Sequence, residues 1–144
     1  MLRLNRRGMV SAASALWGLV GIMLSGIGLA LLWRDHGVLV YTLVGLAVVL
    51  GAFKGNWVMG WVVDRNVSRI RALPQPDRVW KIYRVRGWAF IVAMMCFGIL
   101  LRRYSNGFPG HWGSNALGTI DLTVGVALLI GAGRYCRALV TLEA

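Results

Sequence analysis

The sequence has few charged residues, and very few of them are acidic. Only 5 of its 144 residues are Asp or Glu, against 16 Lys or Arg, and charged residues make up 15% of the chain. Hydrophobic residues account for 58%, and the mean hydropathy is +0.64. This composition excludes a disordered chain and an ordinary soluble domain. The net charge of +11 would suit a nucleic-acid-binding protein, but the hydropathy favours a membrane protein, so we expect no nucleic-acid partner.

Residue types that carry out chemistry are also scarce. Cys96 and Cys136 are expected at different depths in different helices, which excludes a disulfide between them. His36 and His111 have no Cys or His companions at metal-ligand spacing. The sequence contains no phosphate-binding loop, nucleophile elbow or zinc motif. We therefore expect a non-enzymatic protein with no catalytic residue, cofactor or metal.

Four long apolar runs organise the chain. The first has 25 residues without a charge, and at about 1.5 Å per residue it spans roughly 37 Å, enough to cross a hydrocarbon core of about 30 Å. The runs are continuous rather than alternating, so they predict helices and not strands. The sequence predicts an all-α integral membrane four-helix bundle that forms one transmembrane domain over residues 1–144. The expected helices are 9–33, 38–63, 87–101 and 117–140, with a basic connection over 64–86.

The distribution of Lys and Arg predicts the orientation. Three lie in the N-terminal tail, seven in the connection 64–86 and two near the C-terminus, whereas the loops at the other end hold three. Because cytoplasmic loops carry the excess of basic residues, both termini are expected in the cytoplasm. Residues 64–73 should extend the second helix beyond the bilayer, Pro74 and Pro76 should end it, and a helix should resume over 77–86.

A faint internal repeat links the second and fourth apolar runs. Residues 45–54 and 125–134 are identical at four of ten aligned positions, and the alignment makes Lys54 equivalent to Arg134. One interpretation is a duplication that produced two tandem helical hairpins. The other is chance, because Gly, Ala and Leu recur in all membrane helices.

Small residues in the first run predict a helix-packing seam. They recur three or four positions apart, which places them on one helix face and allows another backbone to approach closely. The seam could hold the bundle together or form a dimer contact. The seam residues are Ser14, Gly18, Gly21, Ser25 and Gly28.

A few polar residues in or beside the spans are candidate ion or lipid contacts. Lys54, next to Asn56, could extend to the cytoplasmic headgroups, line an ion or substrate path, or form an interhelical pair, and Arg134 has the same alternatives. Asp121 could stabilise its helix by lying near the positive N-terminus. It could instead pair with Arg102 or Arg103, or titrate in a proton path.

The basic connection is expected to attract anionic headgroups on the cytoplasmic side. Its Lys and Arg residues, Arg65 and Arg69 among them, can be explained by topology and general surface attraction. The alternative is specific recognition of a lipid headgroup or an acidic partner.

The chain resembles small four-helix bacterial inner-membrane proteins of unassigned function. The residues that carry this resemblance are Gly51–Gly55, Asp64–Ile70, Met94–Gly98 with Leu101 and Arg102, and Val124–Leu129. The resemblance covers the second to fourth helices and implies a fold but no activity.

Three functional hypotheses follow from the sequence. The first is a structural or accessory subunit, packed into a homo-oligomer or a larger membrane assembly. The second is a small transporter or channel built from a duplicated hairpin, which requires Lys54, Asn56 and Arg134 to face a wet cavity. The third is a protein that binds anionic lipid in a groove bounded by Lys54, Arg65 and Arg134.

Overall fold

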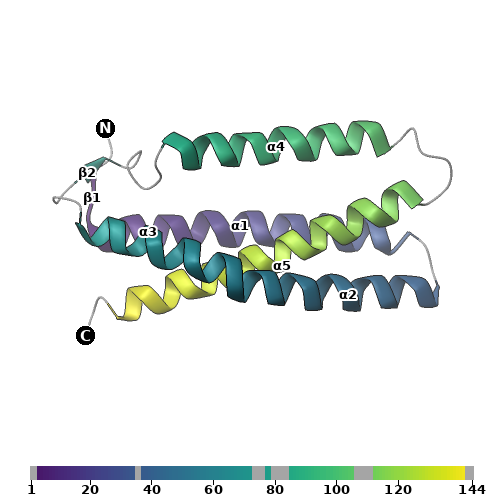
Figure 1. Cartoon of the computed structure of the whole chain (residues 1–144), viewed down its shortest axis with the longest axis horizontal. Helices are drawn as coiled ribbons and strands as arrows, with labels where there is room; N and C mark the ends of the chain where they lie inside the picture. Colours follow the sequence, from purple (N-terminus) through teal and green to yellow (C-terminus); the bar gives the residue numbers. More distant parts are fainter. Residues whose placement is uncertain (1–2, 35–36, 73–76, 79–84, 106–111, 142–144) are drawn as a thin grey trace.

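Four helical rods account for nearly all of the described chain (Figure 1). The computed structural model describes residues 3–34, 37–72, 77–78, 85–105 and 112–141. The second rod is continuous but contains one π-helical turn, which divides it into two α-helical parts. The elements in chain order are β1 (Arg3–Leu4), α1 (Arg6–Leu32), α2 (Val38–Lys54), the π-helix η1 (Gly55–Met59), α3 (Gly60–Ala72), β2 (Asp77–Arg78), α4 (Val85–Ser105) and α5 (Trp112–Val140).

The helical class predicted from the sequence is confirmed. Within the described residues, three helices are long and apolar enough to cross a membrane, judged by length and composition. They are Arg6–Leu32, Val38–Ala72 and Gly113–Val140. The second rod runs on past residue 63, as predicted, and α5 begins at Trp112 rather than at residue 117.

The helix expected over residues 77–86 is wrong at its start. Asp77 and Arg78 form the short strand β2 and pair antiparallel with Leu4 and Arg3 of β1. The pairing joins the segment before α1 to the segment after α3, so the N-terminal tail meets the basic connection. Residues 79–84 lie outside the described part of the chain.

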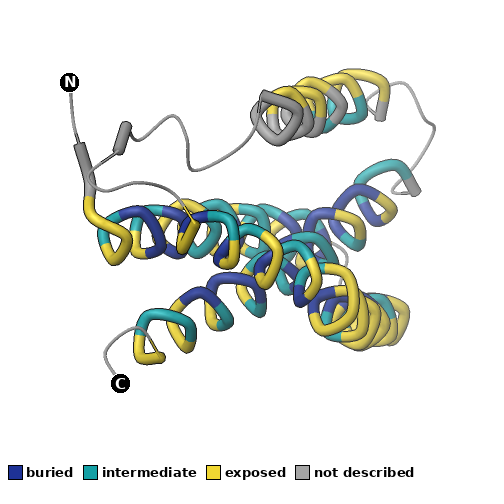
Figure 2. The backbone as a smooth tube through the Cα atoms, turned by 60° about the vertical axis from the view of Figure 1, so that its left-hand side comes forward, coloured by how far each residue is buried: buried dark blue, intermediate teal, exposed yellow. Residues whose placement is uncertain are grey.

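α5 is the central helix of the molecule. One face packs along α1 and another packs along α2 and η1, whereas α1 and α2 make few contacts with each other. Buried residues gather where these rods meet (Figure 2). The residue pairs at the contacts run in opposite order for α1 and in the same order for α2, so α1 is antiparallel and α2 parallel to α5. The two hairpins predicted from the repeat are therefore not separate packing units.

α4 lies beside this three-helix core rather than within it (Figures 1 and 2). Its main contact is with α5, and that contact is small. The described helices thus form a three-helix core with one peripheral helix, where a four-helix bundle was expected.

The small residues of α1 lie against α5 at backbone distance. A Cβ atom placed on Gly28 would lie 2.6 Å from the backbone nitrogen of Leu122 and 2.7 Å from the carbonyl oxygen of Gly118. A Cβ atom on Gly21 would lie 3.1 Å from the carbonyl oxygen of Gly125. Neither backbone can move aside easily, so glycine at these positions sets the distance between the two helices.

The other seam residues lie on the same contact. Ser14 donates a hydrogen bond to the carbonyl oxygen of Ala132 at 3.1 Å, and its Oγ lies 3.1 Å from Sγ of Cys136. Gly18 faces the Cβ atom of Ala132, and Ser25 abuts Gly125. The seam is thus occupied by α5 of the same chain.

The π-helical turn keeps one face of the second rod on α5. Ala47, Gly51 and Gly55 are buried at intervals of four residues, and the next buried residue, Gly60, comes five residues later. In an α-helix, five residues turn through about 500°, which would place Gly60 about 140° away from Gly55. The wider π turn takes up the extra residue. Gly60 and Val63 therefore return to the buried face.

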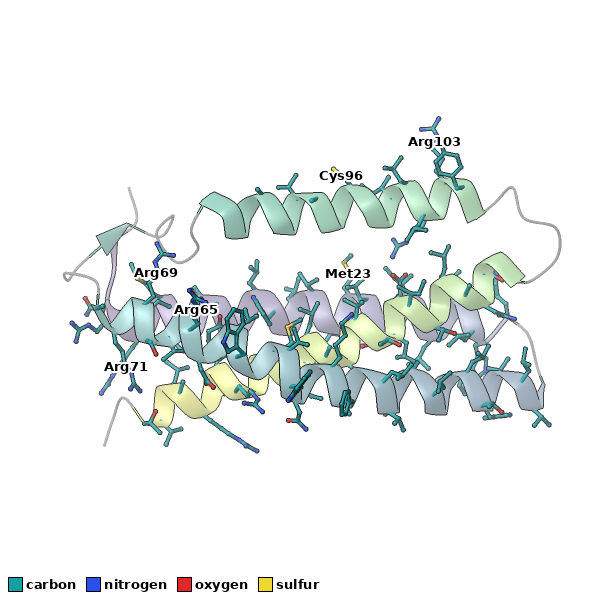
Figure 3. All side chains as sticks on the ribbon, viewed as in Figure 1. Met23, Arg65, Arg69, Arg71, Cys96 and Arg103 are labelled. Atoms are coloured by element: carbon teal, nitrogen blue, oxygen red, sulfur yellow. The ribbon has the colours of Figure 1, made fainter. Side chains whose placement is uncertain are left out.

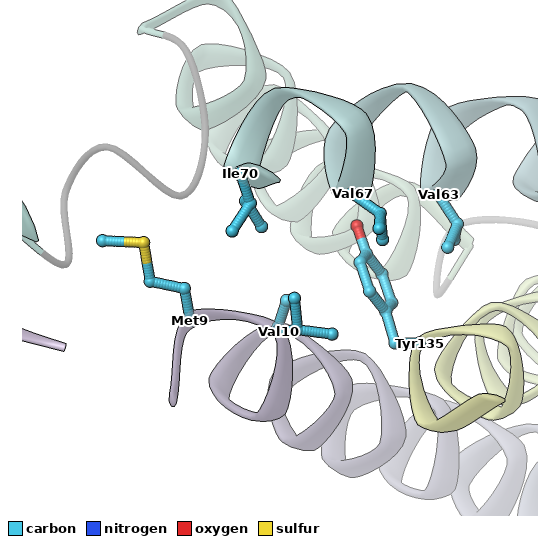
Figure 4. Close-up of a cluster of buried hydrophobic side chains, with 7 residues drawn as sticks. Met9, Val10, Val63, Val67, Ile70 and Tyr135 are labelled. Carbon is cyan, nitrogen blue, oxygen red and sulfur yellow. The ribbon is translucent and has the colours of Figure 1, made fainter. Parts of the chain in front are cut away.

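A hydrophobic cluster closes the core where α1 begins and α5 ends (Figure 4). Tyr135 lies at its centre with no exposed surface, and its hydroxyl accepts a hydrogen bond from Nδ2 of Asn66 at 2.9 Å. The cluster joins α1, α3 and α5, so it positions α3 beside the last turns of α5. Its members are Met9, Val10, Ala13, Val63, Val67, Ile70 and Tyr135.

The seam predicts that alanine substitution of two nearby glycines of α1 will affect stability differently. The substitution Gly28→Ala should destabilise the protein by about 1 to 3 kcal/mol, because the new methyl group overpacks against the α5 backbone. The substitution Gly26→Ala should have no such effect, because a Cβ atom there meets nothing within 4 Å and alanine has the higher helix propensity. Thermal unfolding in the same detergent measures both. Equal losses for the two variants would contradict the packing described.

Candidate functional site

Arg134 joins α5 to the π-helical turn. Its Nη2 donates hydrogen bonds to the backbone carbonyl oxygen of Asn56 at 3.0 Å and to Oδ1 of the same residue at 3.2 Å. A π turn disturbs the regular hydrogen-bond ladder, so a side-chain donor can reach a carbonyl there. A Cβ atom on Gly60 would lie 2.6 Å from Nη1 of Arg134, so the glycine leaves room for the guanidinium. Two of the predicted site residues, Asn56 and Arg134, therefore form one interhelical contact.

Lys54 lies apart from this contact. Its side chain is exposed, and its ammonium group makes no hydrogen bond or ion pair with any residue that the structure describes. It lines a shallow groove of about 300 Å³ whose walls are almost entirely apolar. A lysine stem on such a surface can carry its charge to a headgroup or to water. The groove residues are Leu50, Phe53, Lys54, Trp57, Val58 and Thr123.

A second and more polar cleft lies between α3 and the last turns of α5. It has a volume of about 510 Å³ and contains three arginines and one aspartate. Arg71 Nη2 crosses from α3 to Oγ1 of Thr141 at 3.4 Å. The lining residues are Asp64, Val67, Ser68, Arg71, Arg134, Arg137, Ala138 and Thr141.

This cleft differs from the groove expected from the sequence. Of Lys54, Arg65 and Arg134, only Arg134 lines it. Arg65 is exposed on α3 with its guanidinium 5.1 Å from the ring centroid of Trp61, a cation–π contact. Arg69 is half-buried on the same helix, and neither residue lines the cleft. Figure 3 shows where the arginines of α3 lie.

Asp121 connects the peripheral helix to the core. Its Oδ2 accepts a hydrogen bond from Nη2 of Arg102 at 2.8 Å, which is one of the three alternatives left open by the sequence. The Asp121 side chain is 12% exposed and that of Arg102 is 40% exposed, so the carboxylate is largely withdrawn from the surface. Because α5 starts at Trp112, Asp121 lies more than two turns into the helix and beyond the reach of its N-terminal dipole.

Metal-ligating side chains do not gather in the described residues. No group of three or more His, Cys, Asp or Glu side chains that could hold a metal ion occurs among them. Comparison of the chain with protein-family models, curated proteins and solved structures finds no match. The resemblance to small bacterial inner-membrane proteins therefore stays a prediction.

Sequence reasoning did not predict the π-helical turn or the cleft. The turn had a signal: the small residues Ala47, Gly51 and Gly55 recur every four positions, and the next glycine, Gly60, comes five positions later. The cleft had no comparable signal in the sequence. Arg71 and Arg137 are 66 positions apart and come to line one cleft only once α3 and α5 pack together. The positions of the basic residues along the chain do not show that these two arginines lie in the same cleft.

The Arg102–Asp121 pair predicts how α4 is held. Asp121→Asn should weaken the link between α4 and α5 by about 1 to 2 kcal/mol, because a charge-assisted hydrogen bond is lost. Hydrogen exchange should then speed up in the amides of α4 and stay unchanged in α1. Arg103→Gln is the matched control, since Arg103 lies on the outward face of α4 (Figure 3). Unchanged exchange in α4 of the Asp121→Asn variant would show that other contacts hold the helix.

Proposed function

We propose that the chain is an integral membrane protein of a bacterial inner membrane. Its core crosses the bilayer with α1, the second rod and α5, and α4 lies at the periphery of that core. The length and apolar character of three helices support membrane integration. The clustering of basic residues at one end of the core supports an orientation with both chain termini in the cytoplasm.

We further propose that it acts without catalysis, as a structural or accessory subunit of a homo-oligomer or a larger membrane assembly. The observation that carries this proposal is the state of α4. Among the described side chains, the Arg102–Asp121 pair joins α4 to the core, the contact of α4 with the core is small, and Val92, Ile99 and Leu100 are exposed. Figure 3 shows Cys96 and Arg103 on the side of α4 that points away from the core.

The composition of this outward face favours a protein neighbour. Ala89, Ala93 and Cys96 are small, exposed and three or four residues apart, the spacing that lets another helix approach closely in lipid. The corresponding small-residue face of α1 is already occupied by α5. In the described residues, this small-residue face of α4 is exposed and so available to a partner.

The transporter alternative receives less support. It requires Lys54, Asn56 and Arg134 to share a wet cavity. Lys54 instead lines the apolar groove on the second rod, whereas Arg134 lines the polar cleft and bonds to Asn56. These positions do not form one path.

Cys96 provides a direct test of the homo-oligomer. In a symmetric dimer that packs α4 on α4, Cys96 meets its own copy at the same depth, because a two-fold axis brings equal positions together. Mild oxidation of native membranes should then yield a disulfide-linked dimer. The dimer should persist in Cys136→Ser and disappear in Cys96→Ser.

The same experiment separates the two kinds of assembly. A Cys96-dependent product of larger mass than the dimer would identify a different partner subunit and support the accessory alternative. A chain that stays monomeric under oxidation, and that native mass spectrometry also finds alone after gentle extraction, would contradict the proposal.

A further inference from the structure

The polar cleft between α3 and α5 is lined by basic residues from both helices. Arg71 reaches it from α3, and Arg134 and Arg137 reach it from successive turns of α5. Packing of Val67, Ile70 and Tyr135 in the hydrophobic cluster holds the two helices at this distance. The core therefore places all three arginines on the lining of one cleft, with the Arg134 guanidinium turned to Asn56 and that of Arg71 to Thr141.

The charges in the cleft are unbalanced. Three arginines face one aspartate, and the guanidinium of Arg137 makes no hydrogen bond or ion pair within the described part of the chain. Arg71 bonds only to the hydroxyl of Thr141, at a long 3.4 Å. Donors thus remain available on at least two guanidinium groups, and guanidinium forks match the oxygens of a phosphate.

The depth of the cleft suits a lipid headgroup. If Val38 lies at the outer edge of the hydrocarbon, about 30 Å along the rod ends near Val58. Arg134 packs beside Gly60 and so lies at the inner edge, and the remainder of the cleft extends into the headgroup layer. Val67 and Ala138 add an apolar floor next to it.

Asp64 narrows the choice of headgroup. Its carboxylate lies among the arginines without an ion pair to any described residue, so it can accept hydrogen bonds from a ligand. It would repel a headgroup that carries its own carboxylate. It would accept hydroxyl donors from a headgroup alcohol such as glycerol.

We propose that this cleft binds the headgroup of an anionic phospholipid of the phosphatidylglycerol class. Arg71 and Arg137 bind the phosphodiester, Arg134 borders the site, and Asp64 accepts hydrogen bonds from the glycerol hydroxyls. The inference rests on the proposed membrane orientation but not on the proposed assembly. A general attraction between basic residues and anionic lipid would act over the whole basic surface, whereas this site is confined to the cleft.

Native mass spectrometry of the purified chain in non-ionic detergent tests the site. It counts bound lipids per chain in each oligomeric state, so loss of lipid binding is distinguishable from loss of assembly. The chain is titrated separately with phosphatidylglycerol and with phosphatidylserine, which have the same net charge. The wild-type protein should prefer phosphatidylglycerol by at least about tenfold, the effect of one hydrogen bond to a charged group.

Two matched arginine variants distinguish a site from a charged surface. Arg137→Gln should lower phosphatidylglycerol binding by about tenfold or more and abolish the preference, because a charge-assisted contact is lost. Arg65→Gln removes the same charge from α3 outside the cleft, so it should lower binding of both lipids by about fivefold at most and keep the preference. Asp64→Asn should retain lipid binding and lose the preference.

Three results would overturn the proposal. Equal losses in the Arg137→Gln and Arg65→Gln variants would mean general electrostatic attraction only. Displacement of phosphatidylglycerol by an excess of inorganic phosphate would mean that the cleft recognises a soluble phosphate. An unchanged lipid preference in Asp64→Asn would remove Asp64 from the site, and with it the assignment to a glycerol headgroup.

Discussion

The structure depends on how closely two helix backbones can approach α5. In lipid, apolar side chains gain little by leaving their surroundings, so helices associate through close packing and hydrogen bonds. The face of α5 that carries Gly118, Gly125 and Ala132 packs against glycines and serines of α1 at the same spacing. The other face of α5 packs closely against Gly51 and Gly55 of the second rod. One helix in contact on two faces therefore positions both of its neighbours.

Polar interactions lie toward the two ends of this core. Near one end, Arg102 and Asp121 join α4 to α5. Toward the other end, Arg134 bonds to Asn56 in the π turn, and Asn66 bonds to the buried hydroxyl of Tyr135. Beside Asp121, the hydroxyl groups of Thr119 and Thr123 donate to carbonyls four residues back in their own helix. The hydroxyl of Ser25, which is buried on the α1 seam, has no hydrogen-bond partner among the described residues.

The sequence was sufficient for the helices and for the packing face of α1, because both follow from periodicity along a single segment. It was not sufficient for the partner of that face. The repeat suggested that Gly51 and Gly131 play equivalent parts, but Gly51 lies against Thr123 of α5 and Gly131 lies against the ring of Trp17 of α1. Small residues recur in both segments because each packs closely against another helix, and the pattern carries no information on which one. The choice among partners for Asp121, and the meeting of Arg71 with Arg137, likewise depend on helix contacts that no single segment encodes.

A disulfide between α1 and α5 tests the central position of α5 most directly. A Cβ atom on Gly18 would lie 3.8 Å from the Cβ atom of Ala132, a separation typical of disulfides. In a chain with Cys96 and Cys136 replaced by serine, the pair Gly18→Cys and Ala132→Cys should cross-link within one chain on mild oxidation. The pair Gly26→Cys and Ala132→Cys should not, since a Cβ atom on Gly26 meets nothing within 4 Å. Failure of the first pair, or equal cross-linking of both, would contradict a core built around α5.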